Sequence, residues 1–321
     1  MNEPIFLKPF FQEKIWGGKR LKDEFDYDIP SNHTGECWAI SAHPHGLSIV
    51  ENGPFKGKSL EYVWKNHREE FGNAKGDVFP LLVKILDAKD DLSVQVHPDD
   101  AYAEKHEHEL GKNECWYVIK ADKGAQIYYG HNAKSRSELK EMIYNHEWNK
   151  LFRKKTVHEG DFIYVPSGTV HALGKGLMVL ETQQSSDTTY RIYDFDRIDP
   201  HTKQKRKLHL KQSVECISVP QKDWQIKPEN YHIGDVLVTR FISNKFFSVY
   251  KWVVDGGSGV FKQQAPYMLV SVLDGSGSIK IADQEYLIKK GMHFILPFSV
   301  KSWKIQGNLQ IIASEPGKSI C

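Results

Sequence analysis

The sequence lacks any run of roughly 20 apolar residues, the length that a helix needs to cross a bilayer. Its first ten residues, MNEPIFLKPF, also lack the basic and then apolar order of a signal peptide. We therefore expect a cytoplasmic protein without a membrane partner.

The sequence also lacks a large excess of positive or negative charge. The chain has 43 Lys and Arg against 41 Asp and Glu, a formal net charge of +2, which argues against a nucleic-acid partner. Cysteines are few, and Cys37, Cys115, Cys216 and Cys321 show no paired spacing. This pattern predicts a reduced compartment rather than a disulfide framework.

Short apolar segments fill much of the 321 residues. Segments such as FPLLVKILDA, CWYVIKA, DFIYVPSG and YMLVSVLDG are rich in Val, Ile, Tyr and Phe and are bounded by turn residues. This composition predicts strands, and their regular spacing favours a β-sandwich or barrel. Helical patterns are fewer, and we expect helices at residues 58–71, 99–111, 135–152 and 209–217, with Gly111 ending the second.

A weak internal repeat suggests two domains. Gly160 and Gly291 each precede a proline by the same spacing, at Pro166 and Pro297, and each follows a strand–turn–strand pattern. Two copies of one β-barrel explain the repeat. We expect an N-terminal domain with helical segments at residues 1–217 and a C-terminal domain at residues 218–321.

The stretch SVQVHPDD places polar side chains on one face of a predicted strand. Because residues i and i+2 share a face, Ser93, Gln95 and His97 point one way, and Val94 and Val96 point the other. Either the polar face lines a barrel interior, or it is a solvent-facing edge.

A second segment favours the interior. GDFIYVPSGTVHAL fits the spacing G-x5-P-x-G-x2-H through Gly160, Pro166, Gly168 and His171. This spacing resembles the second signature of the cupin superfamily, whose histidine is a metal ligand. The first cupin signature, H-x-H followed by Glu, would correspond to the pair Gln95 and His97.

The carboxylate of that first signature would be Glu114, after a longer gap that a helix would fill. Gln95, His97, Glu114 and His171 together suit Zn²⁺ or another divalent first-row metal with open positions. The literal H-x-H in HEHEL (residues 106–110) is not an attractive alternative, because i and i+2 diverge by about 200° on a helix. We interpret HEHEL as a solvated polar helix face.

Several blocks in fixed order make the likeness closer. The blocks KIWGGKRL, GECWAISAHPHGLSIVENG, FPLLVKILDAKDDLSVQVHPDD, KNE, PSGTVHAL and ETQQSSDTTYR run from Trp16 to Arg191. In them the chain resembles the type I phosphomannose isomerases of the short bacterial kind. The resemblance implies a mainly β fold of two cupin (jelly-roll) β-barrels with a small helical insertion.

The resemblance also implies an activity and a site. The family interconverts mannose 6-phosphate and fructose 6-phosphate with one Zn²⁺ per chain, held here by Gln95, His97, Glu114 and His171. Its active-site arginine corresponds to Arg191. The residues expected to line the pocket with it are Lys84, Ser93, Lys112, Glu181 and Asp187.

The chemistry of the isomerisation suggests a role for each of these residues. Isomerisation moves a proton between C1 and C2 through an enediol(ate), so Arg191 would stabilise negative charge on oxygen and Glu181 would carry the proton. Lys112 is a third catalytic candidate, and Lys84, Ser93 and Asp187 are substrate-binding candidates. The phosphate would be held by Lys84, Lys112 or Arg191. Alternatively, Asp187 or Glu181 forms a salt bridge with Arg191 that only shapes the loop.

The second repeat has Phe298, Ser299 and Ser302 where the first has the cupin loop and its histidine. We therefore expect the C-terminal barrel to be metal-free. Separately, we expect a monomer or weak homodimer. Three alternatives stay open at this point: a cupin isomerase of glucose 6-phosphate, a metal-binding cupin without catalysis, and a cupin oxygenase.

Overall fold

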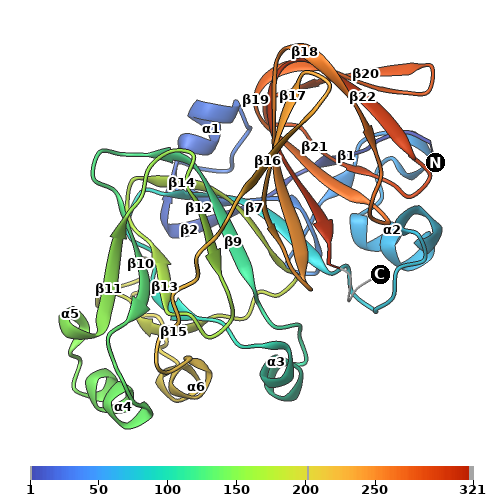
Figure 1. Ribbon diagram of the computed structural model, residues 1–321. Helices are drawn as coiled ribbons and strands as arrows, with labels where there is room; N and C mark the ends of the chain where they lie inside the picture. The colour runs from blue at the N-terminus through green and yellow to red at the C-terminus, as the bar shows by residue number, and fades with distance from the viewer. Residues whose placement is uncertain (1, 201, 318–321) are drawn as a thin grey trace.

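The computed structural model describes residues 2–200 and 202–317, and it is mainly β (Figure 1). Two sheets form the N-terminal half. The five-stranded sheet has the order β11 (Phe152–Thr156), β10 (Gln126–His131), β13 (His171–Leu173), β8 (Val94–Val96) and β15 (Tyr190–Tyr193). The six-stranded sheet has the order β12 (Phe162–Val165), β9 (Glu114–Ala121), β14 (Leu177–Gln184), β7 (Leu81–Ala88), β2 (Phe10–Gly18) and β3 (Thr34–Ile40).

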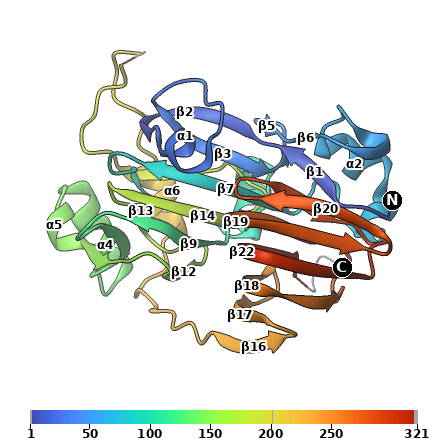
Figure 2. The same ribbon diagram turned by 90° about the horizontal axis from the view of Figure 1, so that it is seen from above.

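The C-terminal half is built on one nine-stranded sheet, whose strands run beside those of the six-stranded sheet in Figure 2. Its order is β16 (Glu229–Ile233), β17 (Val236–Ser243), β18 (Phe247–Lys262), β22 (Ser302–Pro316), β19 (Met268–Ile281), β21 (His293–Leu296), β1 (Ile5–Lys8) and β6 (Ile49–Val50), with β20 (Gln284–Lys289) paired to β19. The first strand of the chain thus belongs to this sheet, with Ile5 opposite Ile295. The division at residue 218 stays a prediction, and the nine-stranded sheet contains residues from both sides of it.

The six-stranded sheet is the middle layer, and its strands are buried on both faces. Along β7, Val83 and Ile85 belong to the core shared with the C-terminal sheet, while Leu86 and Ala88 belong to the core shared with the five-stranded sheet. This double burial explains why FPLLVKILDA reads as a nearly continuous apolar run. It also makes the polar side chain of Lys84 in β7 conspicuous, since that residue is only 3% exposed.

Helices cover the outer face of the five-stranded sheet (Figure 1). Val94 and Val96 of β8 are fully buried there against Leu139 and Ile143, which lie on helix α4 (Arg136–Tyr144). The valines therefore face outward under a helical layer and the polar face of SVQVHP points inward, as predicted. The remaining covering helices are α5 (Trp148–Leu151) and α6 (Leu210–Cys216).

The other predicted helices also form, with shifted ends. Residues 58–71 hold α2 (Leu60–Asn66) and the 3₁₀ turn η2 (Arg68–Phe71), and a further 3₁₀ turn, η1, spans Gly53–Phe55. Helix α3 (Asp100–Glu107) ends four residues before Gly111, because His108 adopts the left-handed conformation with φ of 58°. Gly111 was therefore the wrong stop. Helix α1 (Arg20–Phe25) and the short pair β4 (Ala42–His43) and β5 (Gly46–Leu47) were not predicted.

The sequence predicted neither a membrane-spanning helix nor a disulfide framework. No helix within residues 2–200 and 202–317 has the length and apolarity to span a bilayer. Cys37, Cys115 and Cys216 are free thiols, and Cys321 lies outside the described residues.

Candidate active site

Sheet register places three predicted site residues side by side. Gln95 on β8 lies between His171 on β13 and Arg191 on β15, each directly opposite it. Directly opposed residues of antiparallel strands share a face. The five-stranded sheet therefore presents an imidazole, an amide and a guanidinium in one row toward the sheet that faces it.

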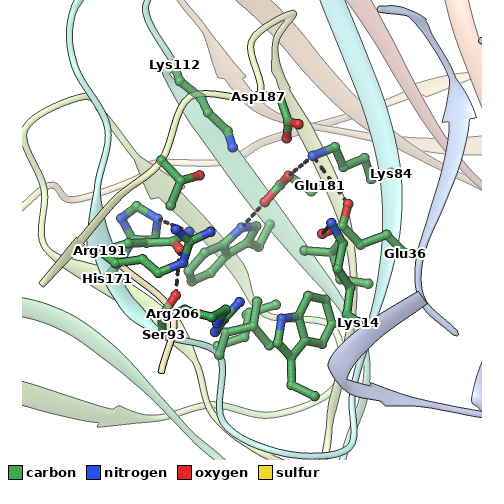
Figure 3. A pocket seen from close by; sticks show the side chains of 17 residues that line it. Lys14, Glu36, Lys84, Ser93, Lys112, His171, Glu181, Asp187, Arg191 and Arg206 are labelled. Carbon is green, nitrogen blue, oxygen red and sulfur yellow. Dashed lines mark hydrogen bonds and ion pairs between the residues drawn. The ribbon is translucent and has the colours of Figure 1, made fainter. Parts of the chain in front are cut away.

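The six-stranded sheet presents a second row. Glu181 on β14 lies between Trp116 on β9 and Lys84 on β7, and Lys84 lies opposite Trp38 on β3. Glu114, the first residue of β9, completes this wall. The two rows enclose a pocket of about 160 Å³, and every predicted site residue except His97 and Glu114 lines it (Figure 3).

His97, Glu114 and His171 converge beside the pocket, which His171 also lines. All three are 1% exposed, and their ligand atoms lie within 4.8 Å of one another. The two Nε2 atoms are 3.2 Å apart, and the Glu114 carboxylate oxygens lie 3.3 Å from His97 Nε2 and 3.2 Å from His171 Nε2. The structure thus brings together the three strongest metal donors predicted from the sequence.

Backbone carbonyls determine how these rings are protonated. His97 Nδ1 lies 3.0 Å from the Thr188 carbonyl and His171 Nδ1 lies 2.9 Å from the Thr169 carbonyl, so each Nδ1 must carry the proton. In the neutral rings both Nε2 atoms are then lone-pair acceptors that face each other. Burial first, and then the charge of Lys112, lowers the pKa of His97 to about 3, so the ring is neutral near pH 7.

This arrangement fits a divalent metal. Two Nε2 lone pairs face a carboxylate whose Oε2 has no hydrogen-bond donor in the described part of the chain. A buried carboxylate oxygen without a donor is costly unless a cation satisfies it. A carbonyl-bound Nδ1–H is also the usual support of a metal-binding histidine.

Gln95 lies where the fourth predicted ligand should be. Its amide nitrogen is 3.5 Å from His97 Nε2 and 3.4 Å from His171 Nε2, and its oxygen faces Ser93 Oγ at 3.3 Å. Amide oxygen and nitrogen exchange places by a rotation of the terminal group. That rotation would present the oxygen to a metal at the cluster.

Glu181 occupies a buried environment beside this cluster. Its Oε2 accepts a hydrogen bond from Trp116 Nε1 at 2.8 Å, and its Oε1 lies 3.9 Å from Lys84 Nζ. Burial, followed by the charge of Glu114, raises the pKa of Glu181 to about 7, against the opposing charges of Lys84 and Lys112. A carboxylate that titrates near neutrality can both take up and release a proton.

Lys84 is held between two carboxylates. Its Nζ lies 3.7 Å from Glu36 Oε2 and 4.5 Å from the centre of the Trp38 ring, in addition to Glu181. Burial opposes its charge, yet Glu36 and Glu181 raise its pKa above the usual value. Lys84 is therefore charged, and its charge is already balanced within the protein (Figure 3).

The other predicted pocket residues have separate contacts. Lys112 Nζ lies 4.0 Å from Glu114 Oε2, and Asp187 Oδ2 lies 2.9 Å from His45 Nδ1 at the rim. Among the described residues, neither Glu181 nor Asp187 forms a salt bridge with Arg191. The loop-shaping salt bridge considered above is thus absent.

Arg191, unlike Lys84, forms no salt bridge with a carboxylate among the described residues. Its Nε is buried and has no hydrogen-bond partner among residues 2–200 and 202–317. Burial, and then the neighbouring Arg206, lowers the pKa of Arg191. Arg206 also lines the pocket, where Asp194 accepts from its Nε at 2.8 Å and from its Nη2 at 2.6 Å.

Four polar residues that line this pocket were not predicted from the sequence: Lys14, Glu36, Thr189 and Arg206. Lys14 and Glu36 lie in blocks that carried the family resemblance, which was a usable signal, whereas Arg206 lies in the polar stretch HTKQKRK without a motif. In HEHEL, His106 and His108 are exposed and lie outside the metal cluster, as expected, but Glu109 turns inward.

The fold and the site together define a class of protein. Two facing antiparallel sheets whose first and second signature histidines meet a carboxylate at one buried point define a cupin, although neither half closes into a continuous hydrogen-bonded barrel. Comparison with known proteins is consistent with this class. The family "Phosphomannose isomerase type I, catalytic domain" matches residues 5–153, and "Mannose-6-phosphate isomerase, cupin domain" matches residues 238–316.

Relatives match along the whole chain. A mannose-6-phosphate isomerase of Streptococcus mutans is 56% identical and mannose-6-phosphate isomerase ManA of Bacillus subtilis is 52% identical, both over 314 residues and 98% of this chain, covering 98% and 99% of the relative. The chain belongs to the type I phosphomannose isomerase family. This membership confirms the resemblance and the cupin jelly-roll fold predicted from the sequence.

Solved structures agree. The crystal structure of mannose 6-phosphate isomerase from Bacillus subtilis superposes with a TM-score of 0.95 at 50% identity, covering 97% of this chain and 99% of that one. A phosphomannose isomerase variant from Salmonella typhimurium shares the fold at 14% identity, with a TM-score of 0.79 and coverage of 98% and 100%.

Metal binding by the cluster can be tested through stability. Metal-free protein should unfold at a higher temperature when Zn²⁺ or Co²⁺ is added, because a ligand at 100 times its dissociation constant adds about 2.7 kcal/mol. His97→Ala and His171→Ala should each remove the rise, measured by calorimetry. His108→Ala, an exposed histidine of the unused H-x-H, is the matched control. An equal rise in His171→Ala would contradict the assignment.

Proposed function

We propose that this chain is a zinc-dependent isomerase that interconverts mannose 6-phosphate and fructose 6-phosphate through an enediol(ate) intermediate. The observation that carries the proposal is the buried His97–Glu114–His171 cluster beside a pocket lined by five cationic side chains. Its relatives named mannose-6-phosphate isomerase support the choice of substrate. The cytoplasmic location and the monomeric or weakly dimeric state stay predictions.

In this proposal, Gln95, His97, Glu114 and His171 hold one zinc ion per chain. When bound, the ion supplies a Lewis acid that polarises the oxygens at the reacting carbons. Ser93 supports Gln95 through their 3.3 Å contact and reaches the pocket itself.

Glu181 is the proposed proton carrier. Its pKa near 7 lets one carboxylate remove a proton from one carbon and return it to the neighbouring carbon at physiological pH. Trp116 donates to one of its oxygens and Lys84 lies near the other. Lys84 and Asp187, which line the pocket, are proposed to bind sugar hydroxyl groups. Lys112 and Arg191 are proposed to stabilise the negative charge that develops on the sugar oxygens.

The charge balance favours the arginine end of the pocket for the phosphate. Lys84 is neutralised by two carboxylates, whereas Arg197 and Arg206 share the single carboxylate of Asp194, and Arg191 has no ion-pair partner among the described residues. A phosphate monoester carries about two negative charges near pH 7. We therefore place the phosphate at Arg206, with Arg191 between it and the metal cluster.

The activity itself is tested with a coupled assay. Purified protein should convert fructose 6-phosphate to mannose 6-phosphate, should lose activity after chelation, and should regain it with Zn²⁺. Full activity in metal-free protein would contradict the zinc mechanism. Equal turnover of glucose 6-phosphate would contradict the substrate, and sugar-phosphate binding without turnover would instead indicate a non-catalytic cupin.

The pH profile tests Glu181. A general base must be ionised, so kcat/KM should fall as the pH is lowered through the pKa of Glu181. A bound metal would offset the charge of Glu114, but Glu181 would stay buried. The apparent pKa of Glu181 should therefore lie above the usual carboxylate value of about 4.3 and no higher than about 7. Glu181→Gln should reduce kcat by at least about 100-fold. A flat profile from pH 8 to pH 4.5, or an active Glu181→Gln enzyme, would remove Glu181 from this role.

The phosphate site is tested by Arg206→Ala. Loss of a charged hydrogen bond of about 1.5–3 kcal/mol should raise KM for mannose 6-phosphate by about 10- to 100-fold. Metal content should not change, and Arg206→Lys should recover part of the loss. Lys205→Ala is the control, because Lys205 is exposed and lies outside the pocket. An unchanged KM in Arg206→Ala would refute this placement.

A further inference from the structure

Residues 98–113, which we call the insert, separate the proposed ligands His97 and Glu114. This gap is longer than in the usual cupin signature, and it contains α3. The acidic side chains of the insert reach a second segment, residues 184–190, which connects β14 to β15 and which we call the rim segment. Asp100 Oδ1 accepts from Gln184 Nε2 at 2.8 Å, and Glu107 Oε1 accepts from Tyr190 Oη at 2.6 Å.

Glu109 makes the densest of these contacts. Its Oε2 accepts from Ser186 Oγ at 2.9 Å, from Thr188 Oγ1 at 2.8 Å, and from the backbone N–H of Asp187 at 3.3 Å. One carboxylate oxygen thus holds three consecutive residues of the rim segment. Such geometry constrains the backbone, since each donor must keep its direction toward the same atom.

The other oxygen of Glu109 is supported by His43. The backbone N–H of His45 donates to His43 Nδ1 at 3.2 Å, so the ring proton of neutral His43 is on Nε2, which lies 3.6 Å from Glu109 Oε1. His43, followed by the hydroxyls of Thr188 and Ser186, lowers the pKa of Glu109 to about 2. Glu109 is therefore an ionised acceptor at neutral pH.

The rim segment in turn touches the metal cluster and the pocket. The Thr188 carbonyl is the group that accepts from His97 Nδ1 at 3.0 Å, while Asp187 and Thr189 line the pocket. Ser186 is fully buried, so the rim segment is held by contacts inside the protein and not by contacts with water. A displacement of Thr188 would move the carbonyl that orients the His97 ring and would move Asp187 with it.

We infer that Glu109 is a positioning residue that holds the Thr188 carbonyl against His97 and Asp187 at the pocket rim, so that the insert serves as a clamp on the metal site. This inference rests on the metal site of the proposed function. It gives HEHEL a role different from metal binding, and it gives a physical reason for the long gap between His97 and Glu114.

The test compares metal binding in Glu109→Ala with that in the unaltered chain. Competition with a chromophoric chelator should show that Zn²⁺ binds about tenfold or more weakly, the usual cost of losing support behind a metal-bound histidine. The visible spectrum of the Co²⁺-loaded variant should also change, since it reports the orientation of the ligands. Glu109→Gln keeps an acceptor oxygen for the three donors and should recover most of the affinity.

Two further variants serve as controls. Glu104→Ala removes an exposed carboxylate from α3, outside the rim contacts, and should leave affinity and spectrum unchanged. Thr188→Val removes the hydroxyl but keeps the carbonyl, so it should weaken Zn²⁺ binding by part of the Glu109→Ala effect. The double variant Glu109→Ala/Thr188→Val should bind no more weakly than Glu109→Ala alone. If Glu109→Ala does not fold, Glu109→Gln and Thr188→Val still provide the comparison.

The outcomes separate this inference from the proposed function. Failure of the unaltered chain to bind Zn²⁺ or Co²⁺ would overturn the metal site itself. Normal binding by the unaltered chain, together with unchanged affinity and spectrum in Glu109→Ala, would overturn only the positioning role. Strictly additive effects of Glu109→Ala and Thr188→Val would also overturn it.

Discussion

The contact between two imidazole nitrogens, His97 Nε2 and His171 Nε2, is the feature on which the site depends. Both rings donate an Nδ1–H hydrogen bond to a backbone carbonyl, so two Nε2 lone pairs face each other in a buried space beside the Glu114 carboxylate. Without a cation, Glu114 Oε2 would stay buried without a hydrogen-bond donor among the described residues. The protein maintains this geometry with the carbonyls of Thr169 and Thr188, so the backbone orients both rings of the proposed metal site.

The jelly roll supplies this geometry through strand register. A one-residue slip of β8 would turn Gln95 away from the pocket and place valines beside His171. The six-stranded sheet, buried on both faces, fixes Glu181 and Lys84 in the same way on the opposite wall. Burial, followed by the charge of Glu114, raises the pKa of Glu181, while the arginine end of the pocket retains uncompensated positive charge. The proposed proton transfer and the proposed phosphate contact thus lie at different ends of one cavity, and the two ends differ in how far their positive charges are balanced.

Local patterns in the sequence predicted the strands, the inward face of SVQVHP and the four candidate metal donors, because side-chain alternation and signature spacing are short-range properties. They did not predict long-range partners. Arg206 and Asp194 come together only in the folded loop after β15, and β1 joins a sheet formed by residues nearly 300 positions away along the chain. Glu109 was misjudged as part of a solvated face, because α3 ends at Glu107 and the chain then turns inward.

X-ray absorption at the zinc edge tests the central claim most directly, because it reports the donors without relying on turnover. Protein loaded with one Zn²⁺ should show imidazole scattering together with oxygen donors, with zinc–nitrogen distances of about 2.0–2.1 Å. The imidazole contribution should decrease in His97→Ala. A spectrum of hydrated zinc without imidazole, or one that His97→Ala leaves unchanged, would contradict a metal centre built from His97, Glu114 and His171.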